Sequence, residues 1–446
     1  MIFLKKYKDD FKLNMKLALP IIAGQLGQIT VYLVDNIMVG QLGAEALASV
    51  SLAIAIIAVP VVVGIGIATA LPALVSEADG AKQHKKISQY FKHSFIVNIV
   101  IGVIACGLMI LGLPLLDHLG QNPDVVILAK EYILMSAIGM IPMMIFMTFR
   151  TFSDGMSQTK PPMIAMLMGN VLNIGLNYLL IFGNFGFPAM GVEGAAIASL
   201  IARISMIIFI ILILMQWKEL WNYIKACDFR TYQKKIFTKI FKLGIPTSMQ
   251  MFFEISAFSG ATLIMGMVSK NAQAAHQIAL NLSSITFMIC SGLAMAASIR
   301  VGNQLGKKDF NALRNAGFSA FIQVTFIMAI CSLFFVIFRS YAPLIYIDDK
   351  EVIEIASLLL IFAAVFQIPD GLQVTALAAL RGLQDVKMPT YITFFSYYLI
   401  GIPISYFSAI TFGLGAPGVW LGLLIGLFIS ATLLIIRFYK LSNKLS

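Results

Sequence analysis

The chain has 446 residues, of which 59% are hydrophobic and only 12% are charged. Soluble domains carry about 25% charged residues, so this composition excludes an ordinary soluble protein and indicates a membrane protein. The formal net charge of +11 does not indicate nucleic-acid binding, because the basic residues gather in alternate loops, as membrane topology requires.

Twelve apolar stretches follow one another along the chain, most of them about 20 residues long, the length that crosses a hydrocarbon core of about 30 Å. They predict an all-α polytopic membrane protein with twelve transmembrane helices and no soluble domain. The predicted spans are 17–39, 47–75, 94–116, 132–149, 163–182, 194–215, 243–266, 274–298, 318–338, 352–378, 391–410 and 418–436. The first twelve residues are too charged for a cleaved signal peptide, so the first span is expected to direct insertion.

Lys and Arg residues are distributed unevenly between the two sides of the predicted helices. Of 32 such residues, 27 fall in the termini and every second loop, four fall in the other loops, and Arg203 lies within a span. Basic residues are retained in the cytoplasm, so both termini are expected there. This pattern predicts a multi-pass protein of the plasma membrane, the inner membrane of a bacterium, and it supports the even number of spans.

The two halves of the chain repeat one pattern. KLALP at 16–20 recurs as KLGIP at 242–246, and AMGV at 189–192 recurs as APGV at 416–419, so the matches keep a nearly constant register. We therefore predict an N-terminal six-helix bundle over 1–215, a basic cytoplasmic linker over 216–242 and a C-terminal six-helix bundle over 243–446. Six spans return the chain to its starting side, so the repeats are parallel and the expected binding site is a central cleft between them.

Polar side chains within the spans are the candidate functional residues, because an ionisable group in hydrocarbon is costly. Asp35 lies in the outer half of the first span, and Asn173 and Asn177 share one face of the fifth. These three could offer oxygen ligands to sodium, or a proton site on the carboxylate. The alternative interpretations are an interfacial position for Asp35 and interhelical hydrogen bonding for the asparagines.

Glu254 lies about 16 Å from the start of its span, and Asp370 lies about 16 Å before Arg381 at the cytoplasmic end, so both are close to the middle of the membrane. They are candidates for cation or proton binding and, with Asp35, for binding a cationic substrate. A structural ion pair is the alternative, with Arg203 as the obvious partner of one of the acids.

Prolines and aromatic residues supply further candidates. Pro20, Pro246 and Pro369 lie within spans and could act as hinges, although a static kink explains each of them equally well. Phe253 and Phe287 are candidates for an adaptable apolar substrate surface.

Signatures of catalysis and metal binding are missing from the sequence. It has no phosphate-binding loop and no His-Glu-x-x-His motif, and its four cysteines and four histidines are dispersed. We therefore expect no enzyme activity, no cofactor, no use of ATP by this chain and no bound metal other than transported sodium.

Four segments resemble those of the multidrug and toxic compound extrusion (MATE) transporters, most closely the NorM-like branch, over essentially the whole chain. They are VDNIMVG at 34–40, AAHQIALN at 274–281, RVGNQLGKKD at 300–309 and LRGLQDVKMP at 380–389. The resemblance implies two six-helix bundles around a central cavity and alternating inward-open and outward-open states.

The same resemblance implies roles for individual residues. Asp35 matches the first-helix aspartate implicated in cation or proton binding, and Asn173 and Asn177 match the asparagines near it. Glu254 in MFFEIS and Asp370 in IPDGLQ match the acidic pair of the second bundle. A contributor from the sixth helix is placed only loosely, near Ser199.

The expected function is outward export of lipophilic or cationic drugs in exchange for sodium or protons. The expected partners are the lipid bilayer, small organic cations and the coupling ion, and the chain is expected to act as a monomer. Alternatives are a lipid-linked saccharide flippase, an exporter of one metabolite, or a membrane scaffold or receptor that transports nothing. A flippase handles a pyrophosphate and should have basic residues in its cavity, whereas most candidates here are acidic.

Overall fold

The computed structural model describes residues 7–118 and 120–445, and these residues form helices and short connections without any strand. Lys5 and Lys6, which contribute to the basic N-terminal tail, lie outside the described residues. Twelve helical stretches in the described part of the chain are long and apolar enough to cross a membrane. Each of them contains one predicted span, so the prediction of twelve transmembrane helices is confirmed.

Several spans are built from more than one helical segment. In the first half, the helices are α2 (Lys8–Gly40), α3 (Ala44–Ala68), α4 (Ala70–Gly80), α5 (His84–Gly112), η1 (Leu113–His118), α6 (Pro123–Ile138), α7 (Met140–Gly155), α8 (Lys160–Phe182), η2 (Asn184–Gly186), α9 (Gly191–Gln216) and α10 (Lys218–Lys225). The second span breaks at Thr69, whose hydroxyl donates to the Gly66 carbonyl at 2.7 Å, and the fourth breaks at Gly139.

The corresponding spans of the second half are continuous helices. The second half consists of α11 (Lys234–Val268), α12 (Lys270–Lys307), α13 (Phe310–Phe338), η3 (Ala342–Ile345), α14 (Lys350–Gly382), α15 (Lys387–Phe394), η4 (Phe395–Gly401), α16 (Ile402–Tyr406), η5 (Phe407–Thr411) and α17 (Ala416–Leu445). The eleventh span, from α15 to η5, contains two stretches of π-helix, in which the backbone hydrogen bonds reach one residue further.

The helices form two compact units that do not follow the order of the sequence. The N-terminal unit comprises Ala23–Ser248, and the C-terminal unit comprises the described residues through Ile22 together with those from Met249 onward. Both boundaries fall inside unbroken helices, α2 and α11. This division differs from the predicted bundles 1–215 and 243–446, and residues 234–242, assigned to the linker, belong to α11.

The two boundaries are related by the internal repeat, because Ile22 and Ser248 follow the matching segments KLALP and KLGIP at the same distance. In the N-terminal unit, a Cβ added to Gly66 of α3 would lie 2.4 Å from the Cα of Ser248. In the C-terminal unit, a Cβ added to Gly292 of α12 would lie 2.4 Å from a side-chain carbon of Ile22. Glycine at these two equivalent positions lets helices approach more closely than any other residue allows.

The turns of the two halves also correspond. Lys82 and Lys308, which occupy matching positions of the repeat, both have left-handed backbone conformations, with φ of 55° and 58°. Ser157 and Gln384, a second matching pair, have φ of 60° and 61°. Such angles are uncommon for residues other than glycine, so their recurrence at matched positions supports the repeat.

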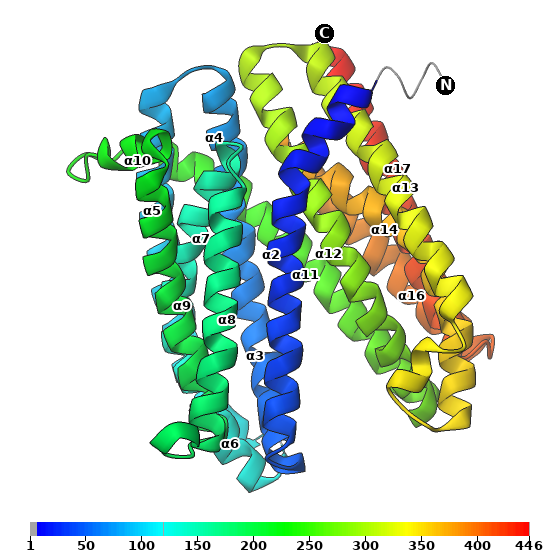
Figure 1. The fold of residues 1–446 in the computed structure, drawn as a ribbon. Coiled ribbons are helices and arrows are strands. Elements are labelled where there is room, and N and C mark those ends of the chain that lie inside the picture. Colours follow the sequence, from blue (N-terminus) through cyan, green and yellow to red (C-terminus); the bar gives the residue numbers. More distant parts are fainter. Residues whose placement is uncertain (1–6, 119, 446) are drawn as a thin grey trace. The chain divides into compact units, whose positions relative to one another are not determined.

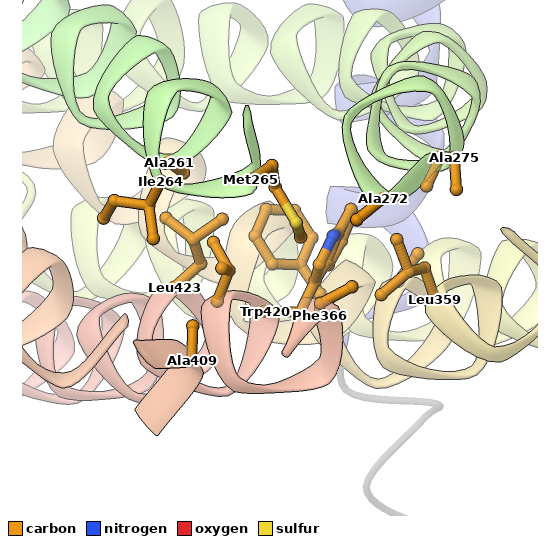
Figure 2. Close-up of a cluster of buried hydrophobic side chains, with 14 of the residues drawn as sticks. Ala261, Ile264, Met265, Ala272, Ala275, Leu359, Phe366, Ala409, Trp420 and Leu423 are labelled. Atoms are coloured by element: carbon orange, nitrogen blue, oxygen red, sulfur yellow. The ribbon is translucent and has the colours of Figure 1, made fainter. Parts of the chain in front are cut away.

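Each unit has its own buried apolar core. In the N-terminal unit, α8 packs on α9 and α5 packs on α7, and in the C-terminal unit α14 packs on α12, α13 and α17 (Figure 1). Figure 2 shows the core of the C-terminal unit, where the rings of Trp420 and Phe366 lie 5.6 Å apart beside Met265. The Trp420 indole N–H donates to Nδ1 of buried His276 at 3.1 Å, so His276 has a structural partner and is not free to act as a base.

Candidate functional site

The N-terminal unit brings together the predicted residues of the first and fifth spans. The Asn177 amide on α8 donates a short hydrogen bond to the Asp35 carboxylate on α2 and a longer one, 3.4 Å, to the Asn173 carbonyl oxygen. Asn173 in turn donates to the Ser199 hydroxyl on α9 at 3.4 Å. Ser199 thus contacts this group, and a contribution to cation binding from the sixth span near Ser199 stays a prediction.

The hydrogen bonds among Asp35, Asn173, Asn177 and Ser199 leave one acceptor oxygen of this group unused among the described residues. Asn177 is fully buried, and its carbonyl oxygen has no hydrogen-bond partner among the described residues. Together with the partly exposed carboxylate of Asp35, it gives the site two oxygen acceptors from two helices. Carboxylate and amide oxygens are suitable ligands for a hard cation, and the carboxylate alone can take a proton.

Arg203 lies in the same unit, on α9. It donates to the backbone carbonyl of Ser136 at 3.4 Å and packs against Gly139, where α6 ends. It interacts electrostatically with Asp35 and Tyr132 but forms no ion pair with a carboxylate within the described residues. The sequence did not identify the partner of Arg203. In the structure, Arg203 interacts electrostatically with Asp35 without forming an ion pair with it.

The C-terminal unit brings Glu254 of α11 and Asp370 of α14 close enough to interact electrostatically. Asp370 is buried and Glu254 is half-buried. Neither carboxylate makes a hydrogen bond or an ion pair in the described part of the chain, so the structural ion-pair interpretation finds no support here. Two neighbouring carboxylates repel each other when both are ionised, and a bound cation or proton relieves that repulsion.

Uncharged polar side chains near this acidic pair were not identified from the sequence. Tyr397 of η4 interacts electrostatically with both acids and donates to the Gln373 carbonyl oxygen at 2.9 Å. Gln367 is fully buried, and neither its amide nitrogen nor its oxygen has a partner among the described residues. Gln367, Asp370 and Gln373 are spaced by three residues on α14, so helical spacing could have revealed them as one face.

The two predicted aromatic residues lie in the C-terminal unit. The Phe253 ring is 5.1 Å from that of Phe394 and 5.5 Å from that of Tyr398. Phe287 packs partly buried against a cluster that contains Cys290, whose thiol interacts electrostatically with both acids. Phe253 thus directly precedes Glu254 in the sequence, and Phe287 packs against the cluster that contains Cys290. Neither ring is fully buried.

The three predicted hinge prolines lie inside continuous helices, Pro20 in α2, Pro246 in α11 and Pro369 in α14. Pro20 and Pro246 each come two residues before the boundary between units. Pro369 precedes Asp370 directly. A proline removes one backbone hydrogen bond of its helix, so these positions bend at lower cost than their neighbours.

One buried acid was overlooked in the sequence. Asp154, near the end of α7, lies 3.9 Å from Arg150 one turn earlier, and one of its carboxylate oxygens has no hydrogen-bond partner within residues 7–118 and 120–445. It was overlooked because the predicted fourth span ends at Phe149, whereas the helix continues to Gly155. No group of three or more metal-ligating side chains was found among the described residues.

The family of the chain follows from comparison with known proteins. The MatE family model matches residues 20–179 and 246–407, once in each half. The chain belongs to this family, the multidrug and toxic compound extrusion transporters, and to its NorM-like branch. It is a multi-pass membrane protein, as the twelve long apolar helices in the described part of the chain indicate.

Curated relatives match over nearly their whole length. A probable multidrug resistance protein NorM from Rhizobium meliloti is 33% identical over 445 residues, which cover 99% of this chain and 95% of the relative. The multidrug resistance protein NorM of Vibrio vulnificus is 32% identical over 445 residues, with 98% and 97% covered.

A solved structure shares the fold. The outward-facing conformation of a multidrug resistance MATE family transporter of the MOP superfamily superposes with a TM-score of 0.89 over 98% of this chain and 96% of that chain. The two sequences are 21% identical, so this likeness shows the fold alone.

Proposed function

We propose that the protein is a secondary active multidrug exporter, which moves lipophilic or cationic drugs outward by alternating access while sodium or protons move inward. The observation that carries this proposal is the pair of neighbouring carboxylates, Glu254 and Asp370, without an ion-pair or hydrogen-bond partner in the described residues. The names of the relatives, multidrug resistance proteins, support the class of substrate.

The carboxylates give a physical route to exchange. Two neighbouring carboxylates, one of them buried, are unfavourable as an anionic pair unless a cation neutralises them, and an inorganic cation, a proton or an organic cation could each do so. Competition between drug and coupling ion, with different affinities in two conformations, links their opposite movements. A membrane potential contributes about 2.3 kcal/mol per charge per 100 mV to an inward-moving cation.

The remaining features of this proposal are the expectations stated under the sequence analysis. The chain lies in the bacterial inner membrane with both termini in the cytoplasm, acts as a monomer, and has neither catalytic activity nor a bound cofactor. The coupling ion would bind Asp35, Asn173 and Asn177 in one unit or Glu254 and Asp370 in the other. Phe253, Phe287 and the acids would contact the drug, and Pro20, Pro246 and Pro369 would bend.

The function can be tested with a fluorescent lipophilic cation in cells that lack their own exporters. Cells expressing the chain should retain less dye than cells with an empty vector. Asp370→Asn removes the charge with little change in volume, so it should restore dye retention to the empty-vector level at unchanged membrane abundance. Efflux by Asp370→Asn at the wild-type rate would remove the acidic pair from the mechanism.

The coupling ion requires purified protein in liposomes. An imposed sodium gradient and an imposed pH gradient of equal driving force are compared in separate samples. Dye movement driven by only one of them identifies the ion. Dye movement driven by neither gradient, in vesicles shown to hold both, would contradict antiport by sodium or protons.

A further inference from the structure

The segment between the two halves of the sequence, residues 217–235, has an amphipathic start. In α10, Leu220 is buried, and Trp221 and Ile224 on the same helical face are half-buried, as is Trp217 directly before the helix. Lys218 and Lys225 are exposed, and the Lys225 ammonium lies 5.9 Å from the centre of the Trp221 ring. Figure 1 shows α10 turned across the ends of α5 and α9, which it contacts.

The loop that follows α10 is fixed to α5 by buried polar groups. Lys92 of α5 is 4% exposed, and its ammonium donates to the backbone carbonyls of Asp228 and Thr231 and, at 3.3 Å, to the Thr231 hydroxyl. The Nε2 atom of buried His93 accepts from the backbone N–H of Gln233 at 2.9 Å. The loop is therefore held in a defined conformation. If it moved away from α5, the buried Lys92 ammonium would lose these carbonyl acceptors, which is unfavourable.

The contacts on α5 place this loop at the level where lipid headgroups lie. They run from Ser88, whose carbonyl accepts from Cys227, to Phe95, whose ring lies 6.2 Å from that of Phe229. The hydrocarbon-spanning part of α5 is predicted to begin at Ser94. The 29 residues of α5 measure about 43 Å, against about 30 Å of hydrocarbon, so its first turns lie in the headgroup layer.

The outward side of the loop combines aromatic and basic side chains. Phe229 is 46% exposed and Tyr232 is 44% exposed, although the loop that carries them is fixed to α5. This segment and the start of α5 also carry exposed basic side chains: Lys85, Lys86, Lys225, Arg230, Lys234 and Lys235. The nearby carboxylate of Asp228 is already engaged, because it accepts from the Arg230 backbone N–H and the Thr231 hydroxyl.

We propose that residues 217–235 form a docking surface for anionic phospholipid headgroups of the cytoplasmic leaflet, with the aromatic rings at the membrane interface and the basic side chains on the phosphates. Tryptophan, tyrosine and basic residues favour this layer, and each basic residue near an anionic surface contributes about 1 kcal/mol. The assignment of the leaflet rests on the orientation given under the proposed function.

Intrinsic tryptophan fluorescence can test this surface. The chain has three tryptophans, and Trp420 is fully buried in the core, so Trp217 and Trp221 report on this segment. The full-length protein is reconstituted in phosphatidylcholine bilayers that contain a minor fraction of either brominated phosphatidylglycerol or brominated phosphatidylcholine. A variant with Trp217→Phe and Trp221→Phe supplies the background signal of Trp420.

We expect brominated phosphatidylglycerol to quench the tryptophan fluorescence more strongly than brominated phosphatidylcholine does. The local enrichment of the anionic lipid should be at least about fivefold, which is the effect of one basic residue that contacts it. High salt should reduce the preference, whereas soluble glycerol phosphate should not compete. Replacing Lys225, Arg230, Lys234 and Lys235 with Gln should abolish the preference. The same number of exposed lysines, Lys307, Lys308, Lys440 and Lys444, replaced with Gln in the C-terminal unit should leave it unchanged.

Equal quenching by the two brominated lipids would overturn the proposal, as would a preference that survives the four substitutions or is lost equally in the control variant. Quenching requires no transport, so this result is independent of the exporter assignment. A protein that fails to export dye but keeps the lipid preference would contradict only the proposed function.

Discussion

At the scale of single residues, the most informative side chain is Asn177. Its amide N–H group donates to Asp35, while its carbonyl oxygen is buried without a protein partner among the described residues. An unsatisfied buried acceptor costs about 1–3 kcal/mol, a cost that a bound ion or water can offset. Asn177 therefore has two roles in the proposed site: its amide nitrogen orients the Asp35 carboxylate, and its carbonyl oxygen is offered to the coupling ion.

We predict that Asn177→Ala weakens binding of the coupling ion about tenfold or more, because hydrogen bonds to charged groups contribute about 1.5–3 kcal/mol. The measurement is the cation concentration, sodium or protons, that gives half-maximal dye efflux in liposomes. Asn170→Ala is the matched control on the same helix, because the Asn170 amide nitrogen is buried without a partner in the described part of the chain. Equal effects of the two substitutions would contradict the role assigned to Asn177.

Cys227 allows a prediction about pH. Burial raises the pKa of the Cys227 thiol to about 11, and the residue lies outside the membrane spans. The thiolate is the reactive form, so a raised pKa means less of it at any pH below 11. Labelling by a maleimide should therefore be about a hundredfold slower than for a cysteine with the ordinary pKa of 9.0 and should rise about tenfold per pH unit.

The rate is measured with Cys106, Cys290 and Cys331 replaced with Ala, so that Cys227 is the only thiol. The reference is Asn222→Cys, at an exposed position of the neighbouring α10, in a background with all four native cysteines replaced. Comparable rates for the two cysteines at pH 8 would show that the loop does not shield Cys227 as described.

At the scale of helices, the close helix–helix contacts at Gly66 and Gly292 are equivalent features of the repeat. Gly66 of α3 accommodates Ser248 of α11, and Gly292 of α12 accommodates Ile22 of α2. The two glycines occupy the same position of the repeat, and so do their partners, so one packing solution serves both units. The sequence showed both glycines as a matched pair, but helical packing partners cannot be read from a repeat alone.

We predict that Gly66→Ala and Gly292→Ala each destabilise the protein by about 1–3 kcal/mol, because the added methyl groups overlap existing atoms. Gly175→Ala in α8 is the control, since nothing lies within 4 Å of a Cβ there and alanine favours a helix. Thermal unfolding of the detergent-purified variants measures the effect. A Gly66→Ala variant as stable as Gly175→Ala would contradict the close packing of α3 on α11.

At the scale of the whole molecule, the alternation of basic residues predicts that both termini are cytoplasmic. Green fluorescent protein folds in the bacterial cytoplasm but not after unfolded export, so a C-terminal fusion should fluoresce. An alkaline phosphatase fusion at the same position should be inactive, while one after Phe187, in the loop between α8 and α9, should be active. The opposite pattern would invert the orientation and the leaflet assigned to residues 217–235.

The sequence was sufficient for the number and place of the spans, because each apolar stretch is long and its length is fixed by the bilayer. It also indicated Asp35, Asn173 and Asn177 as one group, since the two asparagines share a helical face at a depth compatible with Asp35, and the structure places the three within one hydrogen-bonded group. It did not reveal Gln367, Gln373 and Tyr397, because uncharged polar residues in a span are common and only tertiary packing brings Tyr397 to α14. The division into units was also beyond the sequence, since nothing local marks a boundary inside an unbroken helix.

Each unit contains a helical segment from the other half of the sequence, and this arrangement constrains the order in which the protein assembles during synthesis. The N-terminal unit includes residues as far as Ser248, so it cannot be completed when the ribosome has released only the first six spans. Conversely, the segment ending at Ile22 enters the bilayer first but belongs with α12 and α13, which are synthesised much later. Assembly of both units must therefore wait until part of the second half has been synthesised, and halves produced as separate polypeptides could recover the native arrangement only by exchanging these segments.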